Sequence, residues 1–250
     1  MVFESLRRQT RRHETVLLLV LTFGTGVVDA VSYLVLDRVI AGNMSGNVLL
    51  LGMGLAGAGG LQVAGPAIAF AAFWLGAQLC GHALRGAPDG WTSRVSALIA
   101  FSGVVVGLVG VGVALVPPAT SQPSGLGAAA VLGACMGAQA AAARATGVAD
   151  LVADAITGAL VGLGLTFRDS RPDPGRWSRR MGNFALIGVG AFAGALLIRV
   201  HAGFALGLVA VLSVGVAVAG QALLARSPDD QHDVQHDVQR DGQAESGGGP

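Results

Sequence analysis

Long uninterrupted runs of apolar residues constrain the fold of this chain more than any other feature. Eight runs follow one another, at about residues 16–36, 39–59, 63–84, 95–116, 126–143, 148–167, 183–200 and 203–225. Most of them reach the roughly 17–25 residues that an α-helix needs to cross the hydrocarbon core of a bilayer. Backbone polar groups cannot stay unpaired in lipid, and the strands of a membrane barrel would be shorter and would alternate polar and apolar residues. We therefore expect an all-α, polytopic transmembrane helical bundle.

The composition agrees with a protein whose surface faces lipid. Only 12% of the 250 residues are charged and 52% are hydrophobic, whereas a soluble domain carries roughly a quarter charged residues. The formal net charge of +1 gives no field that would attract nucleic acid, so we expect the lipid bilayer, and no nucleic acid, as a partner. The two cysteines are too few for a disulfide framework or a metal site, and we expect no metal and no cofactor.

Arginine clusters indicate which ends of the helices face the cytoplasm. They precede the first run, flank the loop after the third run at Arg85 and Arg94, and crowd residues 168–180, whereas residues 117–124 carry no charge. The positive-inside rule places the arginine-rich segments, including the N-terminus, in the cytoplasm. Eight full spans would put Arg85 and Arg94 outside. Six effective spans keep them inside if runs one and two, and runs five and six, each contain a re-entrant piece and make one net crossing. We expect about six spans, and eight is the alternative.

A repeated pattern divides the apolar part of the chain into two halves. Residues 43–52 (NMSGNVLLLG) resemble residues 155–164 (AITGALVGLG), and the offset of 112 residues superposes the four runs of each half in order. Many transporters consist of such repeats, with the substrate bound near the midplane between them. With six spans the halves would be inverted, and with eight they would be parallel; chance similarity of Gly- and Ala-rich helices is the alternative.

The predicted organisation follows from these boundaries. It comprises a basic cytoplasmic N-terminal tail (1–14), a first transmembrane repeat (15–116), an external linker (117–124), a second transmembrane repeat (125–226) and a disordered polar tail (227–250).

Polar residues inside the apolar runs are the candidates for a functional site, because they are costly in hydrocarbon and usually face a bundle interior or a wet cavity. Asp29 is the foremost candidate, and Ser32 and Tyr33 share its helix face three and four residues further on. Its carboxylate would coordinate a cation or couple transport to protons; the alternative is a hydrogen-bonded Asp that locks two helices together. We expect Gly24 and Gly26 to break the helix here.

A second group of polar residues opens the next run. Asn43 and Asn47 share a helix face, with Ser45 between them, and could hold a polar solute or a cation. A helix end at a glycine break would add its dipole, as in transporters with discontinuous helices. The alternative is hydrogen bonding between helices. The predicted counterparts in the second half are Gln139, Asp154 and Thr157.

The segment GVVDAVSYLVLDRVIAGNMSGNVLLLG resembles the YoaK family, also called the DUF1275 family, of bacterial membrane proteins. The family pattern Gly-x-x-Asp-Ala, Ser-Tyr-Leu, Asn-Met-Thr-Gly-Asn is matched with Ser45 in place of Thr. A second pattern, Gly-x-Gln-Asn-Ala and then a Thr-rich element, is matched in part, with Ala140 for the usual Asn and Ala153 and Asp154 for paired Thr. The resemblance covers about residues 15–225. It implies about six transmembrane helices, a bacterial plasma (inner) membrane location and no established function.

We expect a small-solute transporter-like protein with a polar site between its two repeats. Its partners would be the bilayer, an unidentified small polar solute and, with proton coupling, protons. No P-loop, dinucleotide fingerprint, HExxH or GxSxG motif is present, so nothing in the sequence indicates an enzyme. The alternatives are a non-transporting scaffold or sensor subunit that docks a partner through residues 168–180, and an intramembrane enzyme that acts on lipid. A homo-oligomer is compatible with each.

Overall fold

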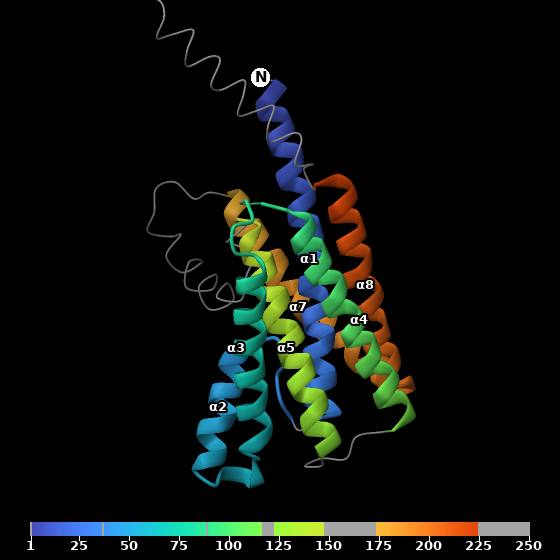
Figure 1. The fold of residues 1–250 in the computed structure, drawn as a ribbon. Helices are drawn as coiled ribbons and strands as arrows, with labels where there is room; N and C mark the ends of the chain where they lie inside the picture. The colour runs from blue at the N-terminus through green and yellow to red at the C-terminus, as the bar shows by residue number, and fades with distance from the viewer. Residues whose placement is uncertain (1, 37, 89, 117–122, 148–173, 225–250) are drawn as a thin grey trace, which may run out of the picture.

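The computed structural model describes residues 2–36, 38–88, 90–116, 123–147 and 174–224, and the described chain is all helical (Figure 1). Within these ranges, side chains are described for all residues except 2–11 and 174–181. The long helices are α1 (Val2–Leu34), α3 (Ala64–Ala83), α4 (Ser93–Leu115), α5 (Pro123–Ala145), α7 (Pro174–Val200) and α8 (Ala202–Leu223). A short helix, α2 (Met44–Leu55), and a 3-10 turn, η1 (Ala58–Gly60), connect α1 to α3.

Six helices are long and apolar enough to cross a bilayer. The apolar stretches are Arg12–Leu34, Ala64–Ala83, Ser93–Leu115, Pro123–Ala145, Gly182–Val200 and Ala202–Leu223. Each has 19 to 23 residues, and at about 1.5 Å per residue this length matches the hydrocarbon thickness of about 30 Å. The predicted transmembrane bundle with about six spans is confirmed. The predicted sixth apolar run, residues 148–167, lies outside the described residues.

The chain between α1 and α3 makes no crossing of its own. After α1 ends at Leu34, extended residues lead back to Asn43, whose side chain reaches Asp29, five residues before the end of α1. Helix α2 then runs in the same direction as α1 and lies beside one half of α3 (Figure 1). With 12 residues, α2 is only about 18 Å long. We call residues 38–55 the re-entrant segment. Because this segment turns back, the first two apolar runs together make one net crossing, as the six-span interpretation expected.

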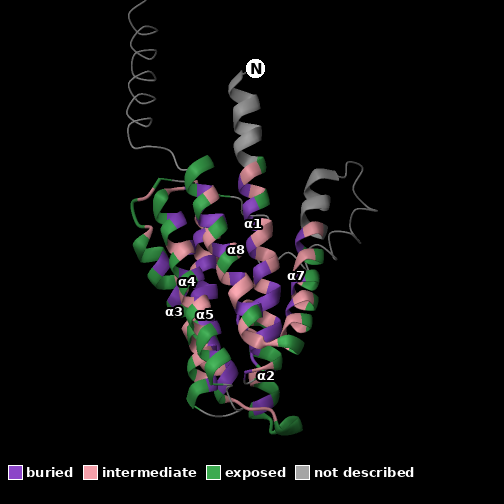
Figure 2. Ribbon diagram, turned by 90° about the vertical axis from the view of Figure 1, so that its right-hand side faces the viewer, coloured by how far each residue is buried: buried purple, intermediate pink, exposed green. Residues whose placement is uncertain are grey.

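Three helix pairs form the body of the bundle: α4 packs on α8, α3 on α5, and α1 on α7. Contacts between α1 and α8 and between α4 and α5 join these pairs. Buried residues line the inner faces of the helices (Figure 2). They form two apolar clusters, one that includes Val27 and Leu132 and one that includes Leu18 and Ile99.

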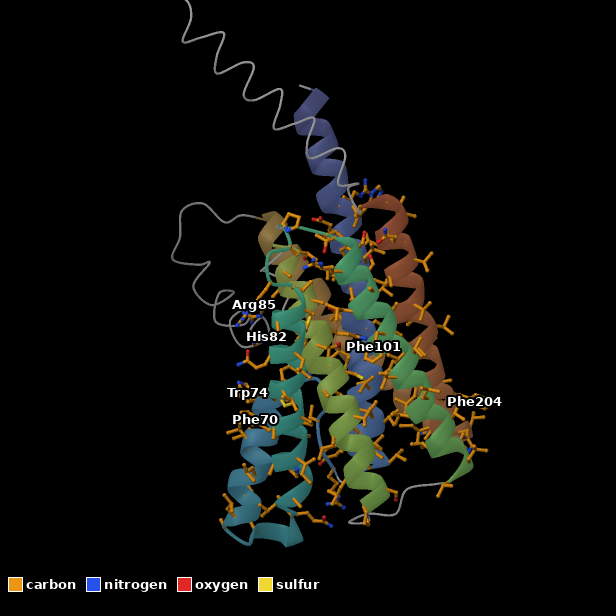
Figure 3. The ribbon with its side chains drawn as sticks, viewed as in Figure 1. Phe70, Trp74, His82, Arg85, Phe101 and Phe204 are labelled. Atoms are coloured by element: carbon orange, nitrogen blue, oxygen red, sulfur yellow. The ribbon has the colours of Figure 1, made fainter. Side chains whose placement is uncertain are left out.

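The outer surface is apolar, as expected for helices that face lipid. Phe70, Trp74, Phe101 and Phe204 point away from the bundle (Figure 3) and are 45–68% exposed. Soluble monomers rarely expose apolar patches of this extent.

Glycines allow two of the helix pairs to approach closely. A Cβ atom at Gly26 of α1 would overlap the carbonyl oxygen of Ile187 in α7, and a Cβ atom at Gly137 of α5 would overlap the carbonyl oxygen of Phe73 in α3. Small residues commonly let membrane helices come into backbone contact in this way. The expectation that Gly24 and Gly26 break the helix is wrong: α1 is continuous through both, and Gly26 instead makes room for α7.

Candidate functional site

Three consecutive backbone amides of the re-entrant segment, residues 40–42, donate hydrogen bonds to side chains of the predicted site. Ile40 donates to Asn47 Oδ1 (2.9 Å), Ala41 to Ser32 Oγ (3.4 Å) and Gly42 to Asp29 Oδ1 (2.6 Å). An extended backbone inside a membrane protein needs such partners, because each unsatisfied amide in an apolar environment costs several kcal/mol. Three of the polar residues in the motif therefore stabilise the non-helical chain next to them.

Asn47 is fully committed to this structural role. Its Oδ1 accepts from the Ile40 amide, and its Nδ2 donates to the Ile40 carbonyl oxygen at 2.6 Å. The side chain is 1% exposed. It therefore closes the turn between the extended residues and α2.

The carboxylate of Asp29 receives two hydrogen bonds from adjacent residues. Oδ1 accepts from the Gly42 amide, and Oδ2 accepts from Asn43 Nδ2 at 2.5 Å. A Cβ atom at position 42 would overlap Thr25 Cγ2, so glycine is needed for this close approach. Because a carboxylate only accepts, the bond also fixes which end of the Asn43 amide faces Asp29.

A partly enclosed cavity of about 80 Å³ lies between α1, α5, α7 and residues 42–43, and we call it the inner cavity. Its volume is enough for a few water molecules or a solute of similar size. Its apolar lining consists of Leu18, Leu21, Met136, Ala140, Ala143 and Ile187, together with Gly42. Its polar lining consists of Thr22, Thr25, Asn43, Gln139 and Asn183.

The inner cavity brings together two predicted site residues from different halves of the chain. Asn43 comes from the re-entrant segment, and Gln139 comes from α5. Gln139 is 6% exposed, and its Nε2 donates to Ser213 Oγ of α8 at 3.3 Å. These two amides thus line the same cavity.

Three polar residues of the inner cavity, Thr22, Thr25 and Asn183, were missed as site residues. Thr22 lies three residues before Thr25 and seven before Asp29, so all three share a face of α1, and this spacing was visible in the sequence. Asn183 is 2% exposed although it stands near the start of an apolar stretch. The amide side chain of Asn183 within an apolar stretch was the sequence feature that could have identified this residue.

A second hollow lies on the other side of Asp29 and Asn43, and we call it the outer groove. It is open, has a volume of about 550 Å³, and is otherwise lined mainly by apolar side chains such as Leu49 and Met53. Tyr33, which is 42% exposed, borders this groove. Asp29 and Asn43 therefore stand between the inner cavity and the apolar surface.

Of the remaining predicted residues, Ser45 does not reach the inner cavity. Ser45 is exposed on α2 and lines neither hollow. Asp154 and Thr157 lie outside the described residues. Within the described part of the chain, no three His, Cys, Asp or Glu side chains come together as a metal site would require.

Comparison with known proteins gives one match. A family model, described as a protein of unknown function (DUF1275), matches residues 17–219, from the first third of the α1 span into α8. No curated protein matches the chain, and no solved structure does.

Proposed function

The chain belongs to the DUF1275 family, whose function is unknown, and from this premise we propose that it transports a small polar solute through the inner cavity. The protein is a multi-pass membrane protein. In this proposal Asn43 and Gln139 contact the solute, and Asp29 holds Asn43 in position.

The observation that carries this proposal is a cavity at membrane depth whose mainly apolar lining includes five polar side chains. Thr22 stands at the middle of the apolar stretch Arg12–Leu34, and the inner cavity extends from there past Asn43 and Gln139. Polar groups at such a depth are costly and are retained mainly along solute or ion pathways. Thr22, Asn43 and Gln139 line an open space. By contrast, both ends of the Asn47 amide are hydrogen-bonded to the backbone of Ile40.

The arrangement of the halves supports transport by an inverted repeat. The Gly26 contact with Ile187 has a counterpart in the Gly137 contact with Phe73, and both join a first helix to a third helix of opposite halves. A further pair of contacts keeps the same register: Gly190 against the Phe23 carbonyl and Gly76 against the Ala134 carbonyl. Helices α1 and α5 run in opposite directions (Figure 1). Such repeats place a substrate site at their interface and let one half rock against the other.

The charge distribution supports a cytoplasmic N-terminus in a bacterial inner membrane. The N-terminus of α1 and the connection from α3 to α4 lie at the same end of the bundle (Figure 1). That connection carries Arg85 and Arg94, and Arg94 donates to the carbonyl oxygens of Ala83 (3.5 Å) and Arg85 (3.2 Å) at the end of α3. Arginines gathered at one end follow the positive-inside rule.

The outer groove favours one competing function, the action of an enzyme on lipid. Its opening toward the apolar surface would admit an acyl chain, and Asp29 lies in its wall. Both carboxylate oxygens of Asp29 are already bonded to Gly42 and Asn43, which leaves this group poorly placed for acid–base chemistry. Transport through the inner cavity is therefore the better-supported function. The scaffold alternative depends on residues 168–180, whose side chains lie outside the described part.

Solute flux into proteoliposomes tests the proposal. Vesicles that contain the wild-type protein should swell faster than empty vesicles in at least one member of a panel of small neutral solutes and salts, as followed by light scattering. Gln139→Ala should slow this flux about fivefold or more, because one lost hydrogen bond is worth about 1 kcal/mol. Gln221→Ala is the matched control, since Gln221 also donates to a serine hydroxyl, that of Ser93, but outside the cavity. Equal flux in both folded variants would contradict the proposed path.

A further inference from the structure

The hydroxyl groups of the inner cavity can only accept hydrogen bonds from a ligand. Thr22 Oγ1 donates its hydrogen to the Leu18 carbonyl oxygen at 3.0 Å, and Thr25 Oγ1 donates to the Leu21 carbonyl oxygen at 3.1 Å. A hydroxyl carries a single hydrogen and two lone pairs. Both threonines therefore present oxygen lone pairs to the space that they line.

The side-chain amides of Asn43 and Gln139, which both line the cavity, each donate one hydrogen bond inside the protein. Asn43 Nδ2 donates to the Asp29 carboxylate, and Gln139 Nε2 donates to Ser213 Oγ at 3.3 Å. Each bond uses one of the two hydrogens of the NH2 group, so each amide keeps its carbonyl oxygen and one N–H for a ligand. The backbone amide of Gly42 donates to Asp29. Oxygen lone pairs therefore outnumber free hydrogens among the threonine hydroxyls and these two amides.

A negatively charged side chain lies next to the cavity. Among the described residues that line the cavity, none is basic. The carboxylate of Asp29 lies directly behind Gly42 and Asn43, within hydrogen-bond distance of both. An anion would meet oxygen lone pairs backed by a negative charge, whereas a cation would meet ligands of the kind that hard cations prefer.

From this arrangement we infer that the inner cavity takes a small monovalent cation, an alkali-metal ion or ammonium. The inference rests on the proposed transport function and specifies its solute class. Neutral oxygens in a ring replace part of the hydration shell of a monovalent ion, as carbonyl groups do in channel filters. A divalent ion holds its water more tightly and would find a single carboxylate here, one that is already doubly hydrogen-bonded.

Cation binding and cation flux are measured separately to test this inference. Binding is followed as the rise in melting temperature of the purified protein when sodium, rubidium or ammonium chloride replaces choline chloride. Flux is followed as uptake of radioactive rubidium or sodium, or of labelled methylammonium, into vesicles of phosphatidylethanolamine and phosphatidylglycerol with an imposed potential. We expect at least one of these cations to stabilise the protein and to enter the vesicles.

Conservative variants identify the binding site. Thr25→Val keeps the shape of the side chain but removes its oxygen, and Asn43→Ala removes an amide. Each should raise the half-saturating cation concentration about tenfold or more, because hydrogen bonds to charged groups are the stronger ones. Thr146→Val is the matched control for Thr25→Val, since Thr146 also donates to a backbone carbonyl, at 2.7 Å, but does not line the cavity.

The outcomes separate the two proposals. Swelling in a neutral solute with no cation binding and no cation uptake would overturn the cation inference and leave transport through the cavity standing. Cation binding that Thr25→Val and Thr146→Val weaken equally would overturn the assignment of the site. Absence of every flux and of every cation effect would overturn both proposals.

Discussion

The helix pairs α1–α7 and α3–α5 pack by the same device but differ in chemistry. In each pair a glycine, Gly26 or Gly137, brings one helix against a backbone carbonyl of the other. Three residues further on, α1 carries Asp29, which binds the re-entrant segment, whereas α5 carries Ala140, which lines the inner cavity. The family resemblance gives Asn as the usual residue at this second position. The two helix pairs therefore share the same packing contact although only α1 carries a polar side chain at this position.

This difference shows that a polar residue in a membrane helix has two quite different uses. Helix α1 is followed by an extended chain. Asp29 and Ser32 accept hydrogen bonds from the backbone amides of residues 42 and 41 in this chain, respectively. Helix α5 offers Gln139, whose amide makes one side-chain bond and otherwise faces the cavity. Substitutions in the first half should therefore act mainly on stability, and those around the cavity mainly on transport.

The largest effect is expected where the two pairs are alike. Gly26→Leu and Gly137→Leu should each destabilise the protein by about 3 kcal/mol or more, because overpacking against backbone cannot be relieved by a side-chain rotation. The measurement is the yield of monodisperse protein in detergent gel filtration. Gly112→Leu is the control, since a Cβ atom there meets nothing within 4 Å. A protein that tolerates leucine at one glycine but not at the other would break the comparison.

An intermediate effect is expected from the bond that closes the re-entrant segment. Asn47→Ala leaves the buried amide and carbonyl groups of Ile40 without partners and should lower the free energy of unfolding by about 1–3 kcal/mol. Unfolding in mixed detergent micelles, followed by circular dichroism, measures this loss. Gln221→Ala, which removes an exposed bond to Ser93, should change stability by no more than about 0.5 kcal/mol. Equal losses in the two variants would mean that Ile40 does not depend on Asn47.

The smallest effect is expected at the position where the pairs differ. Ala140→Asn places an amide in the inner cavity, which Asn43 also lines, and should change stability by less than about 1 kcal/mol because the cavity has room for it. Solute or cation flux should change by less than about tenfold, the equivalent of one hydrogen bond. Ala140→Val separates the effect of size from that of polarity. A loss of stability as large as that of Asn47→Ala would show that position 140 does not face a cavity.

The number and length of the apolar runs predicted the bundle from the sequence, and charge asymmetry predicted the re-entrant piece. The use of Gly26 was not predictable, because a glycine in a membrane helix serves equally as a break or as a contact surface. The residues Asp29, Ser32 and Asn47 were singled out as costly in hydrocarbon, and they accept hydrogen bonds from residues 40–42. Nothing in a linear pattern reveals which backbone atoms lie beside a side chain.

The inner cavity was predictable only in part, for a related reason. Asn43 and Gln139 were expected to lie in the same site, whereas Thr22, Thr25 and Asn183 were missed. A cavity forms where faces of α1, α5 and α7 meet, and the rotation of each helix about its axis depends on packing partners far away in the sequence. Glycine contacts such as that of Gly26 with α7 determine this rotation.

The hydrogen bonds to residues 40–42 have a consequence for the biogenesis of the protein. Helix α1 leaves the ribosome before the re-entrant segment, so Asp29 and Ser32 enter the translocon without the amides that they later accept from. An unpartnered Asp at the centre of an inserting helix costs about 2.5–3.5 kcal/mol, which is an upper bound for Asp29 because this residue lies five residues before the end of α1. The leucine- and valine-rich turns that precede it, in a stretch with a mean hydropathy of 1.9, must offset that cost alone. Co-translational insertion of α1 therefore relies on the apolar side chains of the turns that precede Asp29.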